Sequence, residues 1–417
     1  AHGGGVPCGD RGRHKGMTMW GRKHKLRREA AIIWAKYMVY SSLSWALSLR
    51  YGRNREYRGW ACILRNDGLG DFFISWPVLA GLADYFHARN VPVVVFSSGW
   101  MRDFIVATGK FDAVVPVEVK VFGCSLWRRL LTFAWLRHLA PEAFISLICG
   151  AETRLGLNDL IARFIGARDK YGCAMRLCAR SEFVNRFLYL RHGNRFYNHL
   201  LSVTGRPSLP EIEAGLFRLV TGGAVPPPPE FPCPPAALPP ELAAVGAYCV
   251  LVPGASAPGR RWPVENFREW AARTLTDNPG LTLVIVGTGA EKTLGAEIRR
   301  GLPDGAAIDL CGRTAVAELV AVIRGARFVL TNDTGAAHVS GRLRVPAVCV
   351  LGGGQFGWFA PCAQYPTVRY VYRWRRCFWC GFDCRQDGFV PGRAYPCVAD
   401  IAVAEVLAQT ASLARAV

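Results

Sequence analysis

A strand that runs directly into a helix of small residues, within residues 328–341, most constrains how this chain can fold. Residues 328–330 are apolar, 331–333 form a polar turn, and Gly335 opens the helix. In an open parallel sheet such a turn lies at the carboxyl edge, where ligands bind. The N–H groups and the positive dipole end of the helix suit a phosphate, and small residues let it approach the backbone. An ordinary turn capped by Asp333 is the alternative interpretation.

Strands alternate with helices on both sides of a proline-rich segment. The apolar runs predict strands at residues 61–64, 91–96, 113–116, 143–148, 247–252, 281–286, 306–310, 326–330 and 345–351. Helical patterns follow most of these strands, and residues 176–221 are predicted to be mostly helical. Alternation of this kind indicates βαβ units and parallel sheets.

Nine prolines in residues 226–240 exclude a helix or a central strand there and predict a spacer. The chain of 417 residues is also too long for one ordinary core. We therefore expect an α/β chain with two doubly wound domains, residues 60–221 and 247–417, joined by a linker at 222–246.

Residues 1–59 are predicted to form a basic extension. Residues 1–60 contain 13 Lys and Arg against three acidic residues, which supplies half of the net charge of +20. Residues 30–50 are expected to form an amphipathic helix whose aromatic residues suit a membrane interface. A helix docked on the first domain, or a solvated basic tail, is the alternative.

The chain contains 15 cysteines, several of them within apolar strands. With no visible signal peptide, this pattern favours a reducing cytoplasm. Four further thiols, Cys377, Cys380, Cys384 and Cys397, have a spacing that can hold a structural zinc or an iron–sulfur cluster. Packing of this aromatic-rich loop is the main alternative, an acceptor groove is another, and no metal is expected.

Three strand-to-helix turns of the second domain are rich in ligand-binding residue types. Small residues with arginine suit a diphosphate, and a carboxylate after a glycine turn suits ribose hydroxyls. In a parallel sheet the three turns converge on one edge, which predicts a nucleotide site. No P-loop motif is present. The candidate residues are Ser256, Arg260, Gly287, Glu291, Asp333, Thr334, Gly335 and His338.

The first domain has one comparable turn, residues 66–71, which ends at Asp71. Asp71 opens a predicted helix, so capping that helix is one role for its carboxylate. The functional interpretation is a general base that faces the cleft between the domains.

With these motifs in this order, residues 60–410 resemble glycosyltransferase family 9, the heptosyltransferases of lipopolysaccharide core assembly. The resemblance is carried by residues 63–71, 253–263, 287–291 and 331–338. It implies a GT-B fold, in which the first domain binds the acceptor and the second binds the nucleotide sugar. It also implies inversion at the anomeric carbon without a metal.

The resemblance implies a role for each matching residue. Asp71 would deprotonate the acceptor hydroxyl, Ser256 and Arg260 would contact the diphosphate, and Glu291 would hold the ribose. Asp333, Thr334 and Gly335 would meet the sugar and phosphates, with His338 close by. The family usually has lysine where Arg260 stands, and the basic extension and proline-rich linker also depart from its pattern.

We therefore expect an inverting transferase that moves a heptose from ADP-heptose to a lipopolysaccharide-core or related lipid-linked saccharide. No cofactor is expected beyond the ADP-sugar donor. Residues 1–50 would dock on the anionic inner face of the inner membrane, so the enzyme would be cytoplasmic and peripheral. A GT-B epimerase and a nucleic-acid-binding protein that uses the basic tail are the alternatives. No recognisable nucleic-acid module accompanies the tail, so no nucleic-acid partner is expected.

Overall fold

The computed structural model describes residues 58–117, 126–148, 157–174, 196–225, 230–386 and 389–414, with three isolated positions between 39 and 46. The predicted amphipathic helix at 30–50 lies essentially outside the described residues. Within them, no helix combines the length and apolar character needed to cross a membrane.

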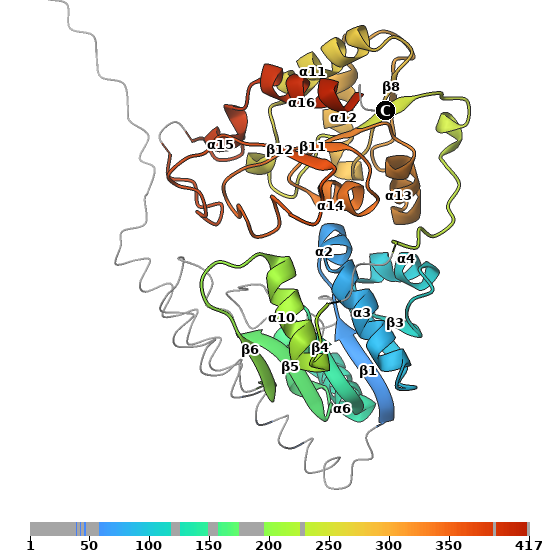
Figure 1. Cartoon of the computed structure of the whole chain (residues 1–417), viewed down its shortest axis with the longest axis vertical. Coiled ribbons are helices and arrows are strands. Elements are labelled where there is room, and N and C mark those ends of the chain that lie inside the picture. The colour runs from blue at the N-terminus through green and yellow to red at the C-terminus, as the bar shows by residue number, and fades with distance from the viewer. Residues whose placement is uncertain are drawn as a thin grey trace, which may run out of the picture.

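The first domain is built on a sheet of six parallel strands with the order β3-β2-β1-β4-β5-β6 (Figure 1). The strands are β1 (Arg58–Leu64), β2 (Val93–Ser97), β3 (Ala113–Pro116), β4 (Pro141–Ser146), β5 (Asp169–Ala174) and β6 (His199–Ser202). Its helices are α2 (Leu69–Ile74), α3 (Trp76–His87), α4 (Arg102–Ala107), α6 (Leu126–Leu139), α7 (Leu157–Phe164) and α10 (Leu209–Thr221).

The second domain repeats this plan with the strand order β12-β11-β10-β7-β8-β9. The strands are β7 (Tyr248–Val252), β8 (Thr282–Ile285), β9 (Ala307–Asp309), β10 (Val329–Asn332), β11 (Ala347–Val350) and β12 (Val368–Val371). The helices are α11 (Val264–Asp277), α12 (Lys292–Arg299), α13 (Val316–Arg324), α14 (Gly335–Arg342), α15 (Pro396–Ala399) and α16 (Val403–Ala414).

Counted within each domain, both sheets therefore have the strand order 3-2-1-4-5-6 of a Rossmann fold. The order reverses between β1 and β4 in the first sheet and between β7 and β10 in the second. Ligands of such sheets bind in the crevice beyond the carboxyl ends of these strands. The predicted fold class, two Rossmann-like doubly wound domains, is confirmed.

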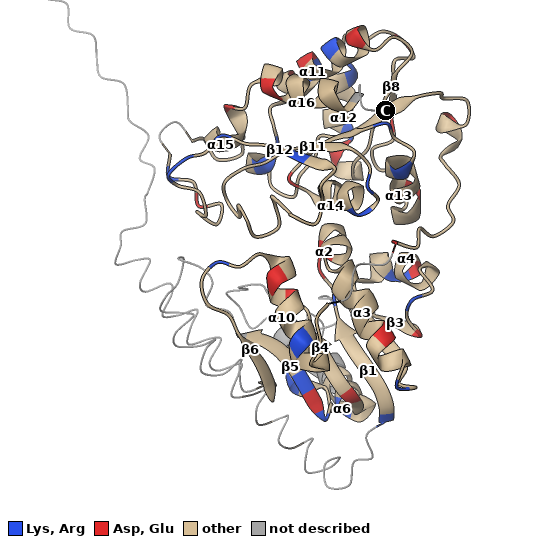
Figure 2. Ribbon diagram, viewed as in Figure 1, with Lys and Arg blue, Asp and Glu red and all other residues tan. Residues whose placement is uncertain are grey.

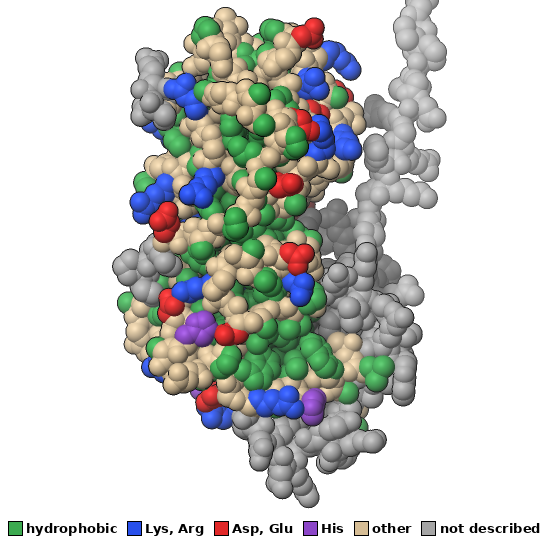
Figure 3. Space-filling model, turned by 90° about the vertical axis from the view of Figure 1, so that its right-hand side faces the viewer, with side chains coloured by type: hydrophobic (Ala, Val, Ile, Leu, Met, Phe, Trp, Pro, Cys, Tyr) green, Lys and Arg blue, Asp and Glu red, His purple; other side chains and the backbone are tan. Residues whose placement is uncertain are grey.

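The strands form because their side chains are apolar on both faces, as expected when helices cover both sides of a parallel sheet. In β1, Ile63 and Leu64 are fully buried on opposite faces of the first sheet. Leu251 of β7 is fully buried in the second sheet. Charged residues lie mainly on the surrounding helices and loops (Figure 2). On the face in Figure 3, basic and acidic side chains are interspersed rather than segregated.

Two local predictions need correction. Residues 176–221 were expected to be mostly helical; residues 176–195 lie outside the described residues, α10 is helical as expected, and His199–Ser202 instead form the edge strand β6. The single helix expected after residue 71 is divided at Ser75 into α2 and α3. Pro77 explains the division, because proline has no N–H to donate to the carbonyl of Phe73. That carbonyl instead accepts a hydrogen bond from Nε of Arg342, on α14 of the second domain, at 3.2 Å.

The described part of the proline-rich linker contains no helix or strand over residues 230–239. Its Phe231 inserts into the first domain, stacked on Phe73 at 4.6 Å between ring centroids and edge-on to Trp76 at 4.7 Å. The linker thus contributes an aromatic side chain to the core beneath α2, and is anchored to the first domain before the chain enters β7.

Candidate functional site

Most candidate residues of both domains lie at the points where the strand order reverses, and Gly287 and Glu291 follow the neighbouring strand β8. In the first domain, Arg65 and the loop to Asp71 follow β1, and Leu147 follows β4. In the second, Pro253 follows β7, and Asp333 follows β10. Helix α2 of the first domain lies directly against α14 of the second (Figure 1). The two switch points therefore face each other across the domain boundary.

The contact between α2 and α14 is made through glycine backbone. A Cβ atom at Gly70 would lie 2.8 Å from the Cα atom of Gly335 and 2.8 Å from Cδ2 of His338. A Cβ atom at Gly335 would lie 3.0 Å from the backbone nitrogen of Gly70. No side chain fits in either place, so the first turns of the two helices touch. This contact brings Asp71, one residue after Gly70, close to the phosphate-type turn at 333–335.

Asp71 occupies the third position of α2, where its carboxylate can both cap the helix and be available as a base. Its Oδ2 accepts a hydrogen bond of 3.0 Å from the N–H of Gly68, so it does cap the helix. Its Oδ1 lies 3.7 Å from Nη2 of Arg65, and 23% of the side chain is exposed. Capping uses one oxygen, and part of the carboxylate stays accessible to solvent.

Ser256, Arg260 and Asp333 are brought together by the turns after β7 and β10. Nη1 of Arg260 donates to Oγ of Ser256 at 3.2 Å, and Nη2 lies 2.9 Å from Oδ2 of Asp333. The guanidinium also stacks over the ring of Phe382, 5.0 Å from its centroid. Thr334, the N-cap residue of α14, lies beside them. The result is one cationic group held at the start of a helix, an arrangement that suits an anion.

The two turns are held together by Asn332, a residue that the sequence did not single out. Its Nδ2 donates to the carbonyls of Pro253 and Gly254 at 2.7 and 3.1 Å, and its Oδ1 accepts from the N–H of Trp262 at 3.0 Å. Every polar atom of this fully buried amide is satisfied. Asn332 thus fixes the loop that carries Ser256 and Arg260 to the strand that precedes Asp333.

Glu291 lies on the other side of the β7 turn. Its Oε2 accepts hydrogen bonds from the N–H and hydroxyl of Thr288, at 2.7 and 3.1 Å. A Cβ atom at Gly254 would clash with its carboxylate, and one at Gly287 would lie 2.7 Å from Oε2. These glycines give the carboxylate room, and it lies 4.0 Å from Nη2 of Arg261. Glu291 and Gly287 therefore border the same turn as Ser256, from the side of β8.

His338 is buried beneath this site on α14. Its Nδ1 has no hydrogen-bond partner among the described residues. Burial is the main reason that the pKa of His338 lies below its ordinary value, although the carboxylates of Asp333 and Asp71 act in the opposite direction. At neutral pH the ring is therefore uncharged, and it packs between Gly70 and the ring of Phe359.

Sequence reasoning missed Glu213, which lies on α10 and is fully buried. Its Oε1 accepts from the hydroxyl of Ser75 at 2.6 Å and lies 3.2 Å from Nη1 of Arg65. The available indication was a carboxylate beside Ile212 on the apolar side of an amphipathic helix, where an unpaired charge is costly. Arg65 itself was within the quoted motif, but its buried position was not anticipated.

The four clustered cysteines are free and partly buried. Two accept backbone hydrogen bonds that lower their pKa, Cys380 from Phe382 and Cys397 from Gly353, but burial raises both pKa values above the ordinary value. Across the described residues, no group of three or more His, Cys, Asp or Glu side chains is arranged to hold a metal ion. A metal at Cys377, Cys380, Cys384 and Cys397 stays a sequence-based possibility.

Comparison with known proteins adds to this geometry. Residues 191–375, which include the turns after β7 and β10, match the model of glycosyltransferase family 9 (heptosyltransferase). Over this stretch the chain is similar to glycosyltransferase family 9. Among curated proteins, lipooligosaccharide heptosyltransferase 2 of Haemophilus influenzae is 28% identical over 28% of this chain and 34% of its own length. Lipopolysaccharide heptosyltransferase 1 of Pseudomonas aeruginosa is 24% identical over 70% of this chain and 78% of its own length.

Solved structures of the family share the fold. The ADP-heptose lipopolysaccharide heptosyltransferase II of Escherichia coli superposes with a TM-score of 0.62 at 18% identity, over 86% of this chain and 99% of that one. The iron-containing dodecameric glycosyltransferase TibC of enterotoxigenic E. coli gives a TM-score of 0.50 at 12% identity, over 87% of this chain and 78% of that one. The family 9 architecture of two facing Rossmann-like domains is thus present over most of the chain.

Proposed function

We propose that this glycosyltransferase moves a heptose from ADP-heptose to a lipopolysaccharide-core or related lipid-linked saccharide, with inversion at the anomeric carbon. The observation that carries the proposal is the contact between α2 and α14. Through this contact Asp71, one residue after Gly70 in the first domain, lies near the turn of the second domain that carries the Arg260–Asp333 pair. The base and the leaving-group site that we propose would thus be adjacent on opposite domains, as a direct displacement requires.

In the proposed reaction, Asp71 takes the proton from an acceptor hydroxyl as that oxygen attacks the anomeric carbon. The new C–O bond forms on the face opposite the breaking bond to the diphosphate, which gives inversion. The leaving ADP gains negative charge. Arg260, the hydroxyl of Ser256 and the first N–H groups of α14 are available to offset it. Glu291 is assigned to the ribose hydroxyls.

Donor identity is tested by calorimetric titration of ADP, UDP, GDP and CDP into the protein and into Arg260→Ala and Asp71→Ala. We expect ADP to bind most tightly, with at least tenfold weaker binding to Arg260→Ala and little change in Asp71→Ala. Transfer by Asp71→Ala should fall by about 10²–10⁴-fold, the usual contribution of a general base. Preference for another nucleotide would replace the ADP-heptose assignment, and a fully active Asp71→Ala variant would remove the base.

We propose that transfer needs no cofactor or metal. The structural neighbour TibC is described as iron-containing, so metal content should be measured directly. Elemental analysis of the purified protein, and of a variant with Cys380 and Cys397 changed to serine, is the test. Activity that survives exhaustive chelation supports the proposal. Stoichiometric metal that disappears in the cysteine variant, together with lost transfer, contradicts it.

We further propose that residues 1–50 dock on the anionic inner face of the inner membrane, close to the lipid-linked acceptor. Their excess of basic residues is what supports this. Sedimentation with anionic and with neutral vesicles, using the full chain and a variant lacking residues 1–59, tests the assignment. Binding that needs both the anionic lipid and the extension is expected. Equal binding by the shortened variant would contradict it.

A further inference from the structure

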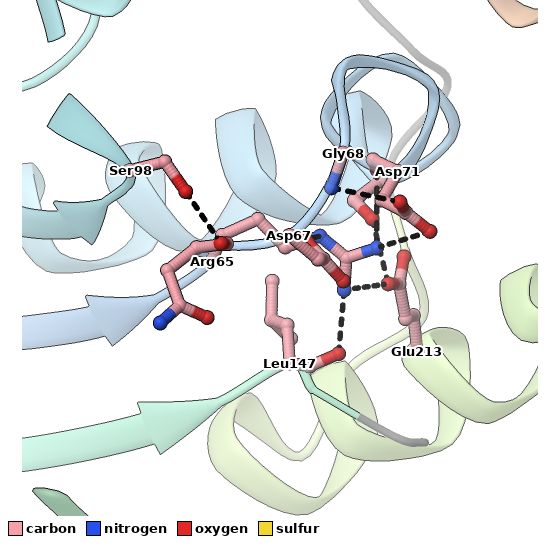
Figure 4. Close-up of polar contacts among 9 residues, drawn as sticks. Arg65, Asp67, Gly68, Asp71, Ser98, Leu147 and Glu213 are labelled. Carbon is pink, nitrogen blue, oxygen red and sulfur yellow. Dashed lines mark hydrogen bonds and ion pairs between the residues drawn. The ribbon is translucent and has the colours of Figure 1, made fainter. Parts of the chain in front are cut away.

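Arg65 forms the centre of a buried polar network next to Asp71. Its side chain is 1% exposed, and it follows β1 directly. Nη1 donates to the carbonyl of Leu147 at 2.6 Å and lies 3.2 Å from Oε1 of Glu213. Nη2 donates to the carbonyl of Asp71 at 3.2 Å and lies 3.7 Å from its Oδ1. Figure 4 shows how β1, β4, α2 and α10 converge on this one guanidinium.

Three carboxyl groups share this single positive charge. Nε of Arg65 lies 3.1 Å from Oδ1 of Asp67, in addition to its contacts with Asp71 and Glu213. The three side chains differ in exposure: 33% for Asp67, 23% for Asp71 and 1% for Glu213. Water can solvate a charge on the first two but not on Glu213. If one of the three carries a proton, the buried one is the favoured site.

Two further observations apply to Glu213. Asp67 shares both, since its Oδ1 is also buried without a hydrogen-bond partner among the described residues and burial raises its pKa to about 7. Among the described residues, Oε2 of Glu213 is buried without a hydrogen-bond partner, which disfavours a full negative charge on that carboxylate. Burial raises the pKa of Glu213 to about 7, even though the guanidinium of Arg65 and the hydroxyl of Ser75 lower it. The charge of Glu213 therefore changes close to neutral pH.

The titratable groups that face Glu213 and Asp71 come from four structural elements. Asp67 lies in the loop that leads to α2, where Asp71 is the third residue, and Arg65 directly follows β1. From the second domain, the uncharged His338 of α14 approaches Asp71. Tyr365, near Glu213, has a pKa raised far above neutral by burial and stays uncharged. Glu213 and Asp67 are thus the two groups in this set whose charge changes near pH 7 and which share the guanidinium with Asp71. Of the two, Glu213 is the one shielded from water, with 1% of its side chain exposed against 33% for Asp67.

We propose that Glu213 is a positioning residue that controls the base strength of Asp71 through Arg65. When Glu213 holds its proton, the charge of Arg65 is left to Asp67 and Asp71. When Glu213 loses the proton to solvent, its negative charge competes for the guanidinium and makes Asp71 the stronger base. This inference rests on the proposed function, in which Asp71 accepts the proton of the acceptor.

The pH dependence of kcat in Glu213→Gln provides the test, because glutamine imitates the neutral acid and cannot ionise. At pH 6 the variant and the natural protein should have kcat values within about twofold of each other. Above pH 7 the natural protein should become faster, by on the order of threefold at pH 8.5, as its base is strengthened. A ratio of the two rates that is the same at every pH overturns the proposal, because a purely structural role would produce that result.

Two companion variants sharpen the comparison. Ser75→Ala removes the hydroxyl that stabilises ionised Glu213, so the rise in kcat should move to higher pH. Glu211→Gln is the matched control, since Glu211 lies on the same helix and only caps its own N-terminus. Its pH profile should coincide with that of the natural protein. A rise that does not move in Ser75→Ala contradicts the assignment of Glu213.

A measurement without substrate separates this inference from the proposed function. Folded Glu213 keeps its proton to about pH 7, whereas an unfolded glutamate loses it near its ordinary pKa. Glu213 therefore makes the natural protein lose stability as pH rises between these values, and Glu213→Gln lacks this part of the loss. The Tm of Glu213→Gln minus that of the natural protein should increase by a few degrees between pH 5 and pH 7.5. A constant Tm difference overturns the protonation of Glu213 whether or not heptose is transferred.

Discussion

Gly70 and Gly335 meet backbone to backbone, with the space that a Cβ atom at Gly70 would need already taken by the Cα atom of Gly335 at 2.8 Å. The two glycines come from different domains and from the first turns of α2 and α14. Their contact determines how far Asp71 lies from the turn that carries Asp333.

Gly70→Ala should therefore separate the proposed base from the proposed donor site. The new methyl group meets backbone atoms and the ring of His338, and neither can move as easily as a flexible side chain. We expect kcat to fall at least tenfold, because small displacements of a catalytic group are costly. ADP affinity should be nearly unchanged, since Ser256 and Arg260 lie within the second domain. Gly246→Ala, where nothing lies within 4 Å of the added atom, is the control for both assays.

Arg260→Lys tests whether the guanidinium geometry matters for the donor. The arginine reaches Ser256 and Asp333 with two different nitrogens, which one ammonium group cannot reproduce in the same plane. We expect ADP affinity to fall by about three- to tenfold, less than in Arg260→Ala, because the positive charge remains. Calorimetry with ADP measures the effect. If ADP affinity fell equally in Arg260→Lys and Arg260→Ala, the positive charge by itself would not explain the contribution of Arg260.

Phe231→Ala tests the anchoring of the linker. Phe231 is 5% exposed, stacks on Phe73 and contacts Trp76 edge-on, so its removal should lower the free energy of unfolding by about 3–5 kcal/mol. Leu238→Ala, in the same linker but 41% exposed, should cost less than about 1 kcal/mol. Urea unfolding of the three proteins gives the comparison. Similar losses in both variants would argue against a core role for Phe231.

The buried His338 predicts a loss of stability in acid. Its pKa is lowered in the folded protein, so below the ordinary histidine value of about 6.5 the unfolded chain binds a proton that the folded one does not. Stability should therefore fall as pH drops through about 6.5, and His338→Gln should remove this part of the dependence. Thermal unfolding of both proteins at pH 5 and 7.5 measures it. Parallel behaviour of the two would contradict the buried, neutral state.

The turns that form the candidate site could be predicted because their composition is local information. Glycines, a hydroxyl and arginine after an apolar run indicate a ligand-binding turn wherever the strand lies in the sheet. Glu213 could not be predicted in this way, since its partner Ser75 is 138 residues away and only the packing of α10 brings them together. The edge strand β6 was missed because residues 199–202 do not form a continuous apolar run in the sequence. Such a run is not needed at this edge of the sheet, where the strand is only partly buried.

The division of the first-domain helix at Ser75 has a consequence for how the halves of the enzyme recognise each other. Because Pro77 has no N–H group, the Phe73 carbonyl lacks the backbone donor that a continuous helix would supply. Arg342 of the second domain donates a hydrogen bond to this carbonyl. An irregularity in one domain thus serves as a docking point for the other. Replacing Pro77 with a residue that has a backbone N–H would let one helix continue through Ser75. That N–H would compete with Arg342 for the Phe73 carbonyl. A gain in helical regularity would then come with a looser association of the two halves.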